Sequence, residues 1–370
     1  GQRLAGTEET DFMSLTTITA EEALRRLGEF DTLIDARSED EYAEDHLPGA
    51  VNWPTLNNEE RKLVGTIYKQ VNAFEANKRG AAMAARNISH HIEREVLDKP
   101  KGWKPLAYCW RGGKRSGSLS LVLSQIGFRI TLLEGGYKAF RNALLEDIPR
   151  LAPKFDWRVI CGTTGSGKTR LLQALESAGA QILDLEALAN HRSSVLGALP
   201  GVPQPSQKHF DTRIWDALRR LDPARPVFVE SESKKVGNVA VPAALIEAMR
   251  AAPCLNLLLP DEQRVALLLE DYDFFVRDSE AFCERLDALT QLRGKQVVEG
   301  WKTQVRAGQI ESVVRDLLLS HYDPVYLQSM VRNFKQYAQA LSISPQDRSV
   351  RAMQALAHEL AAQQHALAAT

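Results

Sequence analysis

A glycine-rich segment of eight residues constrains the fold of this chain more than any other feature. Its sequence is Gly162-Thr163-Thr164-Gly165-Ser166-Gly167-Lys168-Thr169, which matches the pattern G-x-x-x-x-G-K-[ST] in full. The apolar run before it, residues 157–161, predicts a strand, and Leu171, Leu172 and Leu175 predict a helix after it. In this setting the glycines let backbone N–H groups converge on phosphate oxygens, Lys168 adds a positive charge, and the Thr169 hydroxyl can bind Mg²⁺. The segment therefore predicts an α/β domain that holds a phosphate or diphosphate group.

A second loop of the same kind precedes the first by about fifty residues and carries a cysteine. Residues 105–108 predict a buried strand, and residues 114–126 predict a helix with an apolar face. The loop between them contains Cys109, Trp110, Arg111, Gly112, Gly113, Lys114 and Arg115. Free N–H groups, the helix dipole and three cations all favour a thiolate over a thiol at this turn. The thiolate is either a nucleophile or the carrier of an anionic group.

The neighbours of Cys109 have candidate roles of their own. Arg111, Lys114 and Arg115 could bind an anionic substrate or nucleic-acid phosphate. Trp110 could stack on a base that is splayed out of a nucleic acid, or it could pack in the core; its sequence context favours neither.

Length and composition describe an ordinary globular protein of two or three domains. The chain has 370 residues, of which 44% are hydrophobic and 25% are charged. We expect a cytoplasmic protein, because no apolar run reaches transmembrane length, no signal peptide is visible, and the four cysteines show no pairing pattern. Residues 1–11 are polar and patternless and are set aside from the fold. Cys161 and Cys254 lie in apolar runs and are expected to pack in the core.

Charge is distributed unevenly along the chain. The formal net charge is −1, yet thirteen Lys and Arg face only four acidic residues between Arg61 and Arg115. A basic segment that leads into the Cys109 loop favours a large polyanion such as nucleic acid as a partner. The alternative is a solvated helical face whose cations only keep the protein soluble. The candidate contacts to nucleic acid are Arg61, Lys62, Arg79 and Arg86, with Lys208 and Arg213 further along the chain.

Alternating strands and helices predict parallel sheets in two α/β domains. The first domain is expected over residues 14–147, with strands at 32–35, 105–108 and 129–133 and a basic, mostly helical insertion at 59–98. Residues 148–155 are expected to form a linker. The second domain is expected over residues 156–260, with strands at 157–161, 181–185, 226–230 and 254–259. Residues 261–370 are expected to form a helical part that packs on the second domain, and residues 349–370 suit a terminal helix.

The first domain resembles the rhodanese family of sulfurtransferases. The resemblance rests on Asp35-Ala36-Arg37-Ser38, on Glu41-Tyr42 and on His46-Leu47-Pro48-Gly49-Ala50-Val51-Asn52. Asp45 stands where the family usually has Gly, which is a small departure in a turn. The resemblance implies a rhodanese fold in which Cys109 carries a persulfide held by loop amides. Asp35 and Arg37 are expected to pair and to brace the Cys109 loop rather than to act in catalysis.

A rhodanese-like domain followed by a phosphate-binding loop resembles the bacterial tRNA 2-selenouridine synthase family. Further shared motifs are Cys-Trp-Arg-Gly-Gly at 109–113, Asp184-Leu185-Glu186, the run at 189–194, Pro205-Ser206-Gln207, the run at 230–233 and the run at 321–326. The resemblance covers nearly the whole chain. It implies a transferase that replaces the 2-thio group of a wobble uridine in tRNA by selenium from selenophosphate. It also implies geranylation of the thiouridine by geranyl diphosphate, and a selenophosphate-producing enzyme as a partner; neither DNA nor a membrane is implied.

Several polar residues are candidate ligand contacts in the second domain. The strand at 226–230 should end in Asp if the loop serves nucleotide hydrolysis, but it ends in Glu230, and Glu232 follows. A prenyl diphosphate that is not hydrolysed as ATP would suit this departure equally well. Asp184, Glu230 and Glu232 could contact Mg²⁺ or the ligand, although no metal site is certain. His191 and Arg192 could reach the same ligand, whereas His321 and Tyr322 are expected to pack the helical part.

Two other functions fit parts of the sequence. Cys109 and Arg115 satisfy the pattern C-x5-R of phosphatases, in which a cysteine attacks phosphate and an arginine holds it. That function leaves the second loop unexplained. A nucleotide-dependent kinase or switch with a non-catalytic rhodanese module is the other alternative. The sequence does not decide which tRNAs are modified, whether one pocket or two perform the chemistry, whether the Gly162–Thr169 loop binds a nucleotide or a prenyl diphosphate, or the oligomeric state.

Overall fold

The computed structural model describes residues 15–192 and 201–368. They form two compact units with a boundary between Asp147 and Ile148, and the short segment Asp211–Trp215 belongs to the first unit. Residues 1–11, Ser14 at the expected domain start, and Ser193 and Ser194 of the family motif lie outside the described residues. In the described part of the chain, no helix combines the length and the apolar character needed to cross a membrane.

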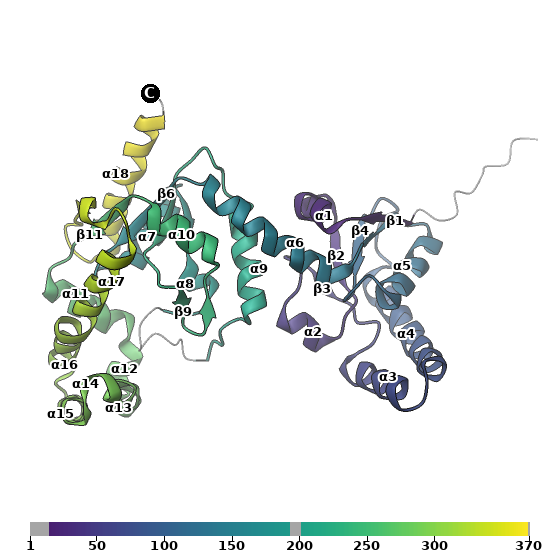
Figure 1. Ribbon diagram of the computed structural model, residues 1–370, viewed down its shortest axis with the longest axis horizontal. Helices are drawn as coiled ribbons and strands as arrows, with labels where there is room; N and C mark the ends of the chain where they lie inside the picture. Colours follow the sequence, from purple (N-terminus) through teal and green to yellow (C-terminus); the bar gives the residue numbers. More distant parts are fainter. Residues whose placement is uncertain (1–14, 193–200, 369–370) are drawn as a thin grey trace, which may run out of the picture. The chain divides into compact units, whose positions relative to one another are not determined.

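The first unit is built on a parallel five-stranded sheet (Figure 1). Its strands are β1 (Leu15–Ile18), β2 (Thr32–Asp35), β3 (Val51–Asn52), β4 (Pro105–Tyr108) and β5 (Ile130–Leu133), in the order β1-β5-β4-β2-β3. The central strand β4 is buried along its whole length. Cys109 follows it directly and therefore lies at the carboxyl edge of the sheet. The sequence did not predict β1 or β3, which are short and largely exposed.

Helices surround this sheet, and some of them also line the candidate site. They are α1 (Ala20–Arg26), the short η1 (Leu27–Glu29), α2 (Glu39–Glu44), α3 (Asn58–Gln70), α4 (Ala73–Glu95), α5 (Lys114–Ile126) and α6 (Gly136–Leu151). The basic insertion predicted at 59–98 consists of α3 and α4. Asn57 and Asn72 cap these two helices with their side-chain oxygens. The helices approach closely where Gly80 faces Val64, because an added Cβ at Gly80 would lie 3.5 Å from the Val64 methyl groups.

The second unit contains another parallel five-stranded sheet. Its strands are β6 (Trp157–Cys161), β7 (Gln181–Leu183), β8 (Val227–Glu230), β11 (Cys254–Leu257) and β12 (Leu341–Ile343), in the order β12-β11-β6-β8-β7. A small antiparallel pair, β9 (Lys235–Val236) and β10 (Val239–Ala240), lies outside it. The central strand β6 ends at the Gly162–Thr169 loop, as the sequence predicted. The structure thus confirms the expected order of an α/β unit on a parallel sheet followed by a second α/β unit with a helical C-terminal region.

The remaining elements are mostly helices. They are η2 (Ala152–Lys154), α7 (Lys168–Ser177), α8 (Leu185–Leu188), α9 (Gln207–Leu218), α10 (Ala243–Ala251), α11 (Asp261–Asp271), α12 (Asp273–Arg277), α13 (Ser279–Asp287), α14 (Thr290–Arg293), α15 (Lys295–Arg306), α16 (Ile310–Leu317), η3 (Leu318–Tyr322), α17 (Asp323–Asn333), η4 (Tyr337–Gln339) and α18 (Val350–Ala368).

Two segments differ in detail from the sequence prediction. The expected linker, 148–155, is not an irregular segment: α6 continues through Pro149 to Leu151, and η2 follows. The expected helical part, 261–370, also contributes the edge strand β12, which pairs with β11 through Leu341, Ser342 and Ile343. Beyond β12, the predicted terminal helix α18 packs Met353 and Leu356 on the apolar side of α7.

Candidate active sites

The Cys109 sulfur lies at the start of a loop between β4 and α5 and accepts two hydrogen bonds. The Gly113 N–H donates to Sγ at 3.2 Å, and the Ser116 hydroxyl donates to it at 3.1 Å. The residue is only 3% exposed, yet it lines a pocket of about 640 Å³. Two donors aimed at one sulfur suit a negatively charged sulfur, or a chalcogen bound to it, better than a neutral thiol. The site thus combines a buried sulfur, contacted by two hydrogen-bond donors, with room for a ligand.

The backbone of this loop is held by the first turn of α6. The Tyr137 N–H donates to the Cys109 carbonyl at 2.8 Å, and the Lys138 N–H donates to the Trp110 carbonyl at 3.0 Å. Gly136 has φ +59°, and an added Cβ there would lie 2.3 Å from the Cys109 carbonyl oxygen. The close approach therefore requires glycine. N–H groups of α6 thus hydrogen-bond to both carbonyls and hold the loop in the shape in which the Gly113 N–H points at the Cys109 sulfur.

Asp35 and Arg37 lie below the loop as a buried ion pair. The Arg37 guanidinium donates to Asp35 at 2.7 and 3.0 Å and to the Asp45 carbonyl at 2.6 Å. The Tyr108 hydroxyl, one residue before Cys109, donates to Asp35 at 2.8 Å. Neither Asp35 nor Arg37 lines the Cys109 pocket. The expected pairing of Asp35 with Arg37 is thus present, and their role as a brace of the Cys109 loop stays a prediction.

The three cations of the Cys109 loop have different surroundings. Arg111 is exposed and lines the pocket, and the Lys114 ammonium donates to the Asn77 side chain of α4 at 3.1 Å. Arg115 donates to both Glu41 carboxylate oxygens, at 2.7 and 3.3 Å, and Arg61 reaches the same carboxylate at 3.2 Å. Burial acts to raise the pKa of Glu41, but hydrogen bonds and charge from Arg115, with help from Ser38, lower it to about 2.

This arrangement bears on the phosphatase alternative. A C-x5-R phosphatase needs the arginine fork to face the phosphate that the cysteine attacks. Here both terminal nitrogens of Arg115 are bound to Glu41. The geometry therefore does not favour a phosphatase.

The other candidate residues of the first unit lie around the pocket or on its outer surface. Trp110 is half-buried and stacks on Tyr137, with ring centroids 5.6 Å apart. Lys62, Arg79 and Arg86 are exposed on α3 and α4. The helical hairpin thus presents cations outside and smaller side chains toward Cys109.

The Gly162–Thr169 loop of the second unit curls around the start of α7. Gly165 and Gly167 adopt left-handed φ values of +79° and +91°. Lys168 donates its ammonium to the Gly162 carbonyl at 2.7 Å and lies over the Tyr326 ring. The Tyr326 hydroxyl in turn accepts from the Gly162 N–H at 2.8 Å. The cradle predicted from Gly162, Thr163, Thr164, Gly165, Ser166, Gly167, Lys168 and Thr169 is therefore closed on one side by Tyr326.

Arg264 of α11 fixes the same loop from below. Its guanidinium donates to the Thr164 carbonyl at 2.9 and 3.1 Å and to Asp323 at 2.6 Å, and the residue is only 3% exposed. Nothing in the local sequence marked Arg264 for this task, because the contact joins residues a hundred positions apart.

Three carboxylates converge beside the loop. One carboxylate oxygen from each of Glu186, Glu230 and Glu232 lies within 4.8 Å of the others. Glu230 is 5% exposed, and its Oε1 has no hydrogen-bond partner. Burial raises the pKa of Glu230 to about 8, with the charges of Glu186 and Asp184 adding to the effect. Clustered carboxylates with an orphaned buried oxygen fit a hard divalent cation such as Mg²⁺.

The structure separates the other predicted ligand contacts of this unit. Asp184 caps α8 by accepting from the Ala187 N–H at 2.9 Å, so it supports Glu186 instead of joining the cluster. Arg192 lines the pocket over the loop, donates to the Asp271 carbonyl and lies over the Tyr272 ring. His191 does not line that pocket, and burial lowers the pKa of its imidazole. Lys208 and Arg213 are half-buried on α9.

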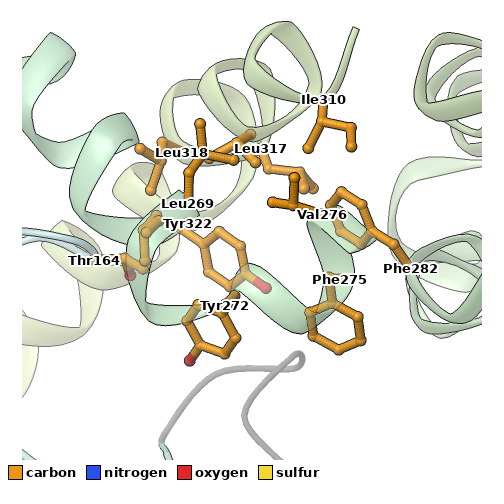
Figure 2. A pocket seen from close by; sticks show the side chains of 12 residues that line it. Thr164, Leu269, Tyr272, Phe275, Val276, Phe282, Ile310, Leu317, Leu318 and Tyr322 are labelled. Atoms are coloured by element: carbon orange, nitrogen blue, oxygen red, sulfur yellow. The ribbon is translucent and has the colours of Figure 1, made fainter. Parts of the chain in front are cut away.

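Two adjoining pockets open at the Gly162–Thr169 loop. The polar one has a volume of about 600 Å³ and is lined by Lys168, Thr169 and the three glutamates. The other is narrow, about 40 Å³, and its lining is apolar apart from three hydroxyl-bearing side chains (Figure 2). Thr164, Leu268 and Tyr272 line both pockets, so the two lie side by side at this point. Tyr322, expected to pack the helical part, lines the apolar pocket, while His321 is buried.

The sequence did not predict a role for some of the site residues. Glu41, Glu186 and Tyr326 stand inside segments whose family resemblance was noted, but no role was assigned to them. The sequence could have indicated a role for Glu186, because it lies two residues after Asp184 at the strand end and forms an acidic pair with it. Tyr326 gave no such signal, because it reaches Gly162 across 164 positions of sequence.

Fold and sites together define a class: a rhodanese-like unit with a cysteine loop, joined to a unit with a phosphate-binding loop. Comparison with protein families agrees, since residues 19–143 match the rhodanese-like domain and residues 155–294 match the tRNA 2-selenouridine synthase AAA domain. The chain belongs to the tRNA 2-selenouridine synthase family.

Curated relatives support this membership. A tRNA 2-selenouridine synthase of Sulfurovum sp. is 32% identical over 81% of this chain and 89% of its own length. One of Nitrosomonas europaea is 39% identical over 65% of this chain, but the match spans only 63% of that relative. A solved rhodanese-related protein of Thermoplasma volcanium is 16% identical, covering 34% of this chain and 91% of its own, with a TM-score of 0.23. That score is too low to add to the argument.

Proposed function

We propose that this protein modifies the wobble uridine of tRNA in two steps. The first transfers a geranyl group to the sulfur of 2-thiouridine, and the second replaces the resulting thioether by selenium from selenophosphate. The family of the chain and the presence of two different anion cradles support the proposal. The proposed substrates place the reaction in the cytoplasm, with a selenophosphate-producing enzyme as supplier.

One observation carries the assignment of the first step to the second unit: the pocket over the phosphate cradle adjoins an apolar pocket and shares lining residues with it. Lys168 and the loop amides suit a diphosphate, whereas Leu268, Phe275 and Leu317 suit a hydrocarbon. Apart from three hydroxyls, the side chains of the apolar pocket offer no hydrogen-bonding groups for the edges of a nucleobase. As it stands, the narrow pocket has room for about three water-sized groups, so its side chains must move to admit the whole ten-carbon chain.

The transfer itself is a displacement. The thiouridine sulfur forms a bond to C1 of the geranyl group while the C1–O bond breaks, and diphosphate leaves with the electron pair. N3 of the base releases its proton to solvent, so the S-geranyl base is neutral. Lys168 and the amides of the loop stabilise the charge that develops on the departing group. Glu186, Glu230 and Glu232 would hold a Mg²⁺ ion, which supplies further neutralisation of diphosphate charge.

The second step belongs to Cys109 and requires no oxidant. The Cys109 thiolate attacks C2 of the S-geranyl base, the C2–S bond to the geranyl group breaks, and geranylthiolate leaves with the electron pair. Selenium of selenophosphate then displaces Cys109 from C2, and water takes the phosphoryl group as phosphate. The donors from Gly113 and Ser116 stabilise the thiolate before the attack and after its release.

Binding of geranyl diphosphate to a Lys168→Ala variant tests the first assignment. We expect the dissociation constant to rise by about tenfold or more, because one charged contact to the diphosphate is lost. An exposed lysine of the same unit, changed in Lys154→Ala, serves as the control and should leave binding unchanged. Chelation of divalent cations should weaken binding to the wild-type protein as well. Unchanged affinity in Lys168→Ala would remove the cradle from this role.

A further inference from the structure

The pocket over Cys109 has two chemically different walls. One is the loop itself, with Cys109 and the cations Arg111 and Lys114. The other is formed by α3 and α4 and presents mainly aliphatic or small side chains, among them Val64, Ala76, Gly80, Ala81 and Ala84, with Tyr68 at the border. No acidic residue is among the side chains that line it in the described part of the chain.

Neither selenophosphate nor an unmodified base explains the wall formed by α3 and α4. An anion needs cations and N–H donors, and the edges of a base need hydrogen-bonding groups. The polar side chain that α4 offers, Asn77, already accepts from Lys114. At about 640 Å³ the pocket is also far larger than a selenium donor requires and falls in the range of small-molecule sites. Half of the cavity is thus suited to hydrocarbon and lies beside a nucleophile.

We propose that this wall binds the S-geranyl group of the modified wobble base and holds it as the leaving group of the Cys109 reaction. This inference rests on the proposed function and deepens it, since it assigns a specificity site to the second step. With the chain against α3 and α4, C2 of the base faces the Cys109 sulfur, and the C2–S bond that breaks lies between the two walls.

The charges at the rim agree with this occupant. Arg111 is exposed beside the sulfur, and Arg61 lines the pocket with its side chain 54% exposed. Cations at the mouth suit the phosphates on either side of the base, while the apolar wall takes the chain. A free thiouridine would leave the wall empty, so the pocket discriminates in favour of the prenylated base. The discrimination should amount to about tenfold or more, because even one methylene group in an apolar pocket changes selectivity by about that factor.

The experiment uses the full chain and a tRNA stem-loop whose 2-thiouridine has been alkylated chemically, so that it bypasses the geranylation step. Binding of the S-geranyl RNA is compared with binding of an S-methyl RNA of the same sequence. Wild-type protein should bind the geranyl form about tenfold or more tightly. The variants Ala81→Leu and Ala84→Leu fill the wall and should reduce this preference toward one. Ala82→Leu places the same side chain at an exposed position of α4 that does not line the pocket and should retain the preference.

An unchanged urea-unfolding transition and unchanged affinity for the S-methyl RNA show that the variants are folded. Equal binding of the two RNAs by wild-type protein, or an undiminished preference in both filled variants, would overturn the inference. A wild-type protein that prefers the geranyl RNA but cannot produce it from geranyl diphosphate would instead refute the first step of the proposed function. The two failures are thereby distinguishable.

Discussion

Each of the two units of this protein has a loop between a parallel strand and a helix, but the two loops have opposite chemical surroundings. The Cys109 loop has a sulfur at its start and cations along its rim, and none of the side chains lining its pocket is acidic. The Gly162–Thr169 loop has an ammonium at its centre and faces three converging carboxylates. Under the proposed function, the first pocket serves a nucleophile that acts on a base within an anionic RNA, and the second holds a cation and a diphosphate leaving group. Each pocket also adjoins an apolar surface, as the proposed transfer and later departure of a prenyl group require.

Loss of the sulfur gives the sharpest contrast between the two sites. Cys109→Ser should reduce selenium incorporation by a factor of about a thousand or more, since hydroxyl is a far weaker nucleophile than thiolate. Geranylation should persist at a large fraction of the wild-type rate, because the proposed function assigns it to the other unit. Mass spectrometry of nucleosides from treated tRNA measures both products in one sample. A folded mutant that has lost both activities would show that the division of labour is wrong.

Gly136→Ala should also impair only the Cys109 site, but by displacing the loop and not by removing the sulfur. The new Cβ would meet the Cys109 carbonyl at 2.3 Å, which displaces the loop and costs about 3 kcal/mol of stability. Gly49→Ala is the matched control, since Gly49 has φ +76° but no heavy atom within 4 Å of an added Cβ. It should cost only about 1 kcal/mol, the penalty of left-handed backbone. Urea unfolding separates the two, and equal costs would show that contact with the loop is unimportant.

Charge reversal on the helical hairpin tests whether the first unit binds tRNA. The triple change of Lys62, Arg79 and Arg86 to Glu should weaken binding about tenfold or more and flatten its dependence on salt, because fewer counterions are released. Arg219→Glu and Arg277→Glu reverse exposed charges of the second unit and serve as the control. Binding titrations at several salt concentrations provide the slopes. An unchanged slope in the triple variant would place the tRNA elsewhere.

The smallest expected effect is a pH dependence at Glu41. Its pKa of about 2 lies below the ordinary value of 4.5, so its pairing with Arg115 stabilises the folded state above about pH 4.5 and is lost as the pH falls toward 2. Glu41→Gln should therefore lower the urea midpoint at pH 7, and the difference from wild type should shrink in acid. A difference that is constant from pH 7 to pH 3 would contradict the ion pair.

The sequence predicted those features whose determinants are local. The strand, loop and helix around Cys109 follow from a four-residue apolar run, two glycines and the periodicity of residues 114–126, and the helix begins and ends where expected. The Gly162–Thr169 loop follows in the same way. Pairing of Asp35 with Arg37 could also be predicted, because the two residues are only two positions apart in the sequence.

Features that depend on contacts between distant segments could not be predicted from the sequence. The strand β12 has only three residues in a helical context, and it exists because β11 offers a free edge for pairing. Glu186 meets Glu230 and Glu232 only once β7 and β8 are neighbours in the sheet. The apolar wall near Cys109 depends on how closely α3 and α4 pack at Gly80, which no local pattern reveals.

Nucleoside mass spectrometry of purified 2-thiouridine tRNA tests the central claim most directly. The tRNA is incubated with this protein and geranyl diphosphate, selenophosphate, both, or neither. The account predicts S-geranyl-2-thiouridine with geranyl diphosphate alone and 2-selenouridine only when both substrates are present. Efficient formation of 2-selenouridine from selenophosphate alone, in tRNA that has never carried a geranyl group, would contradict it.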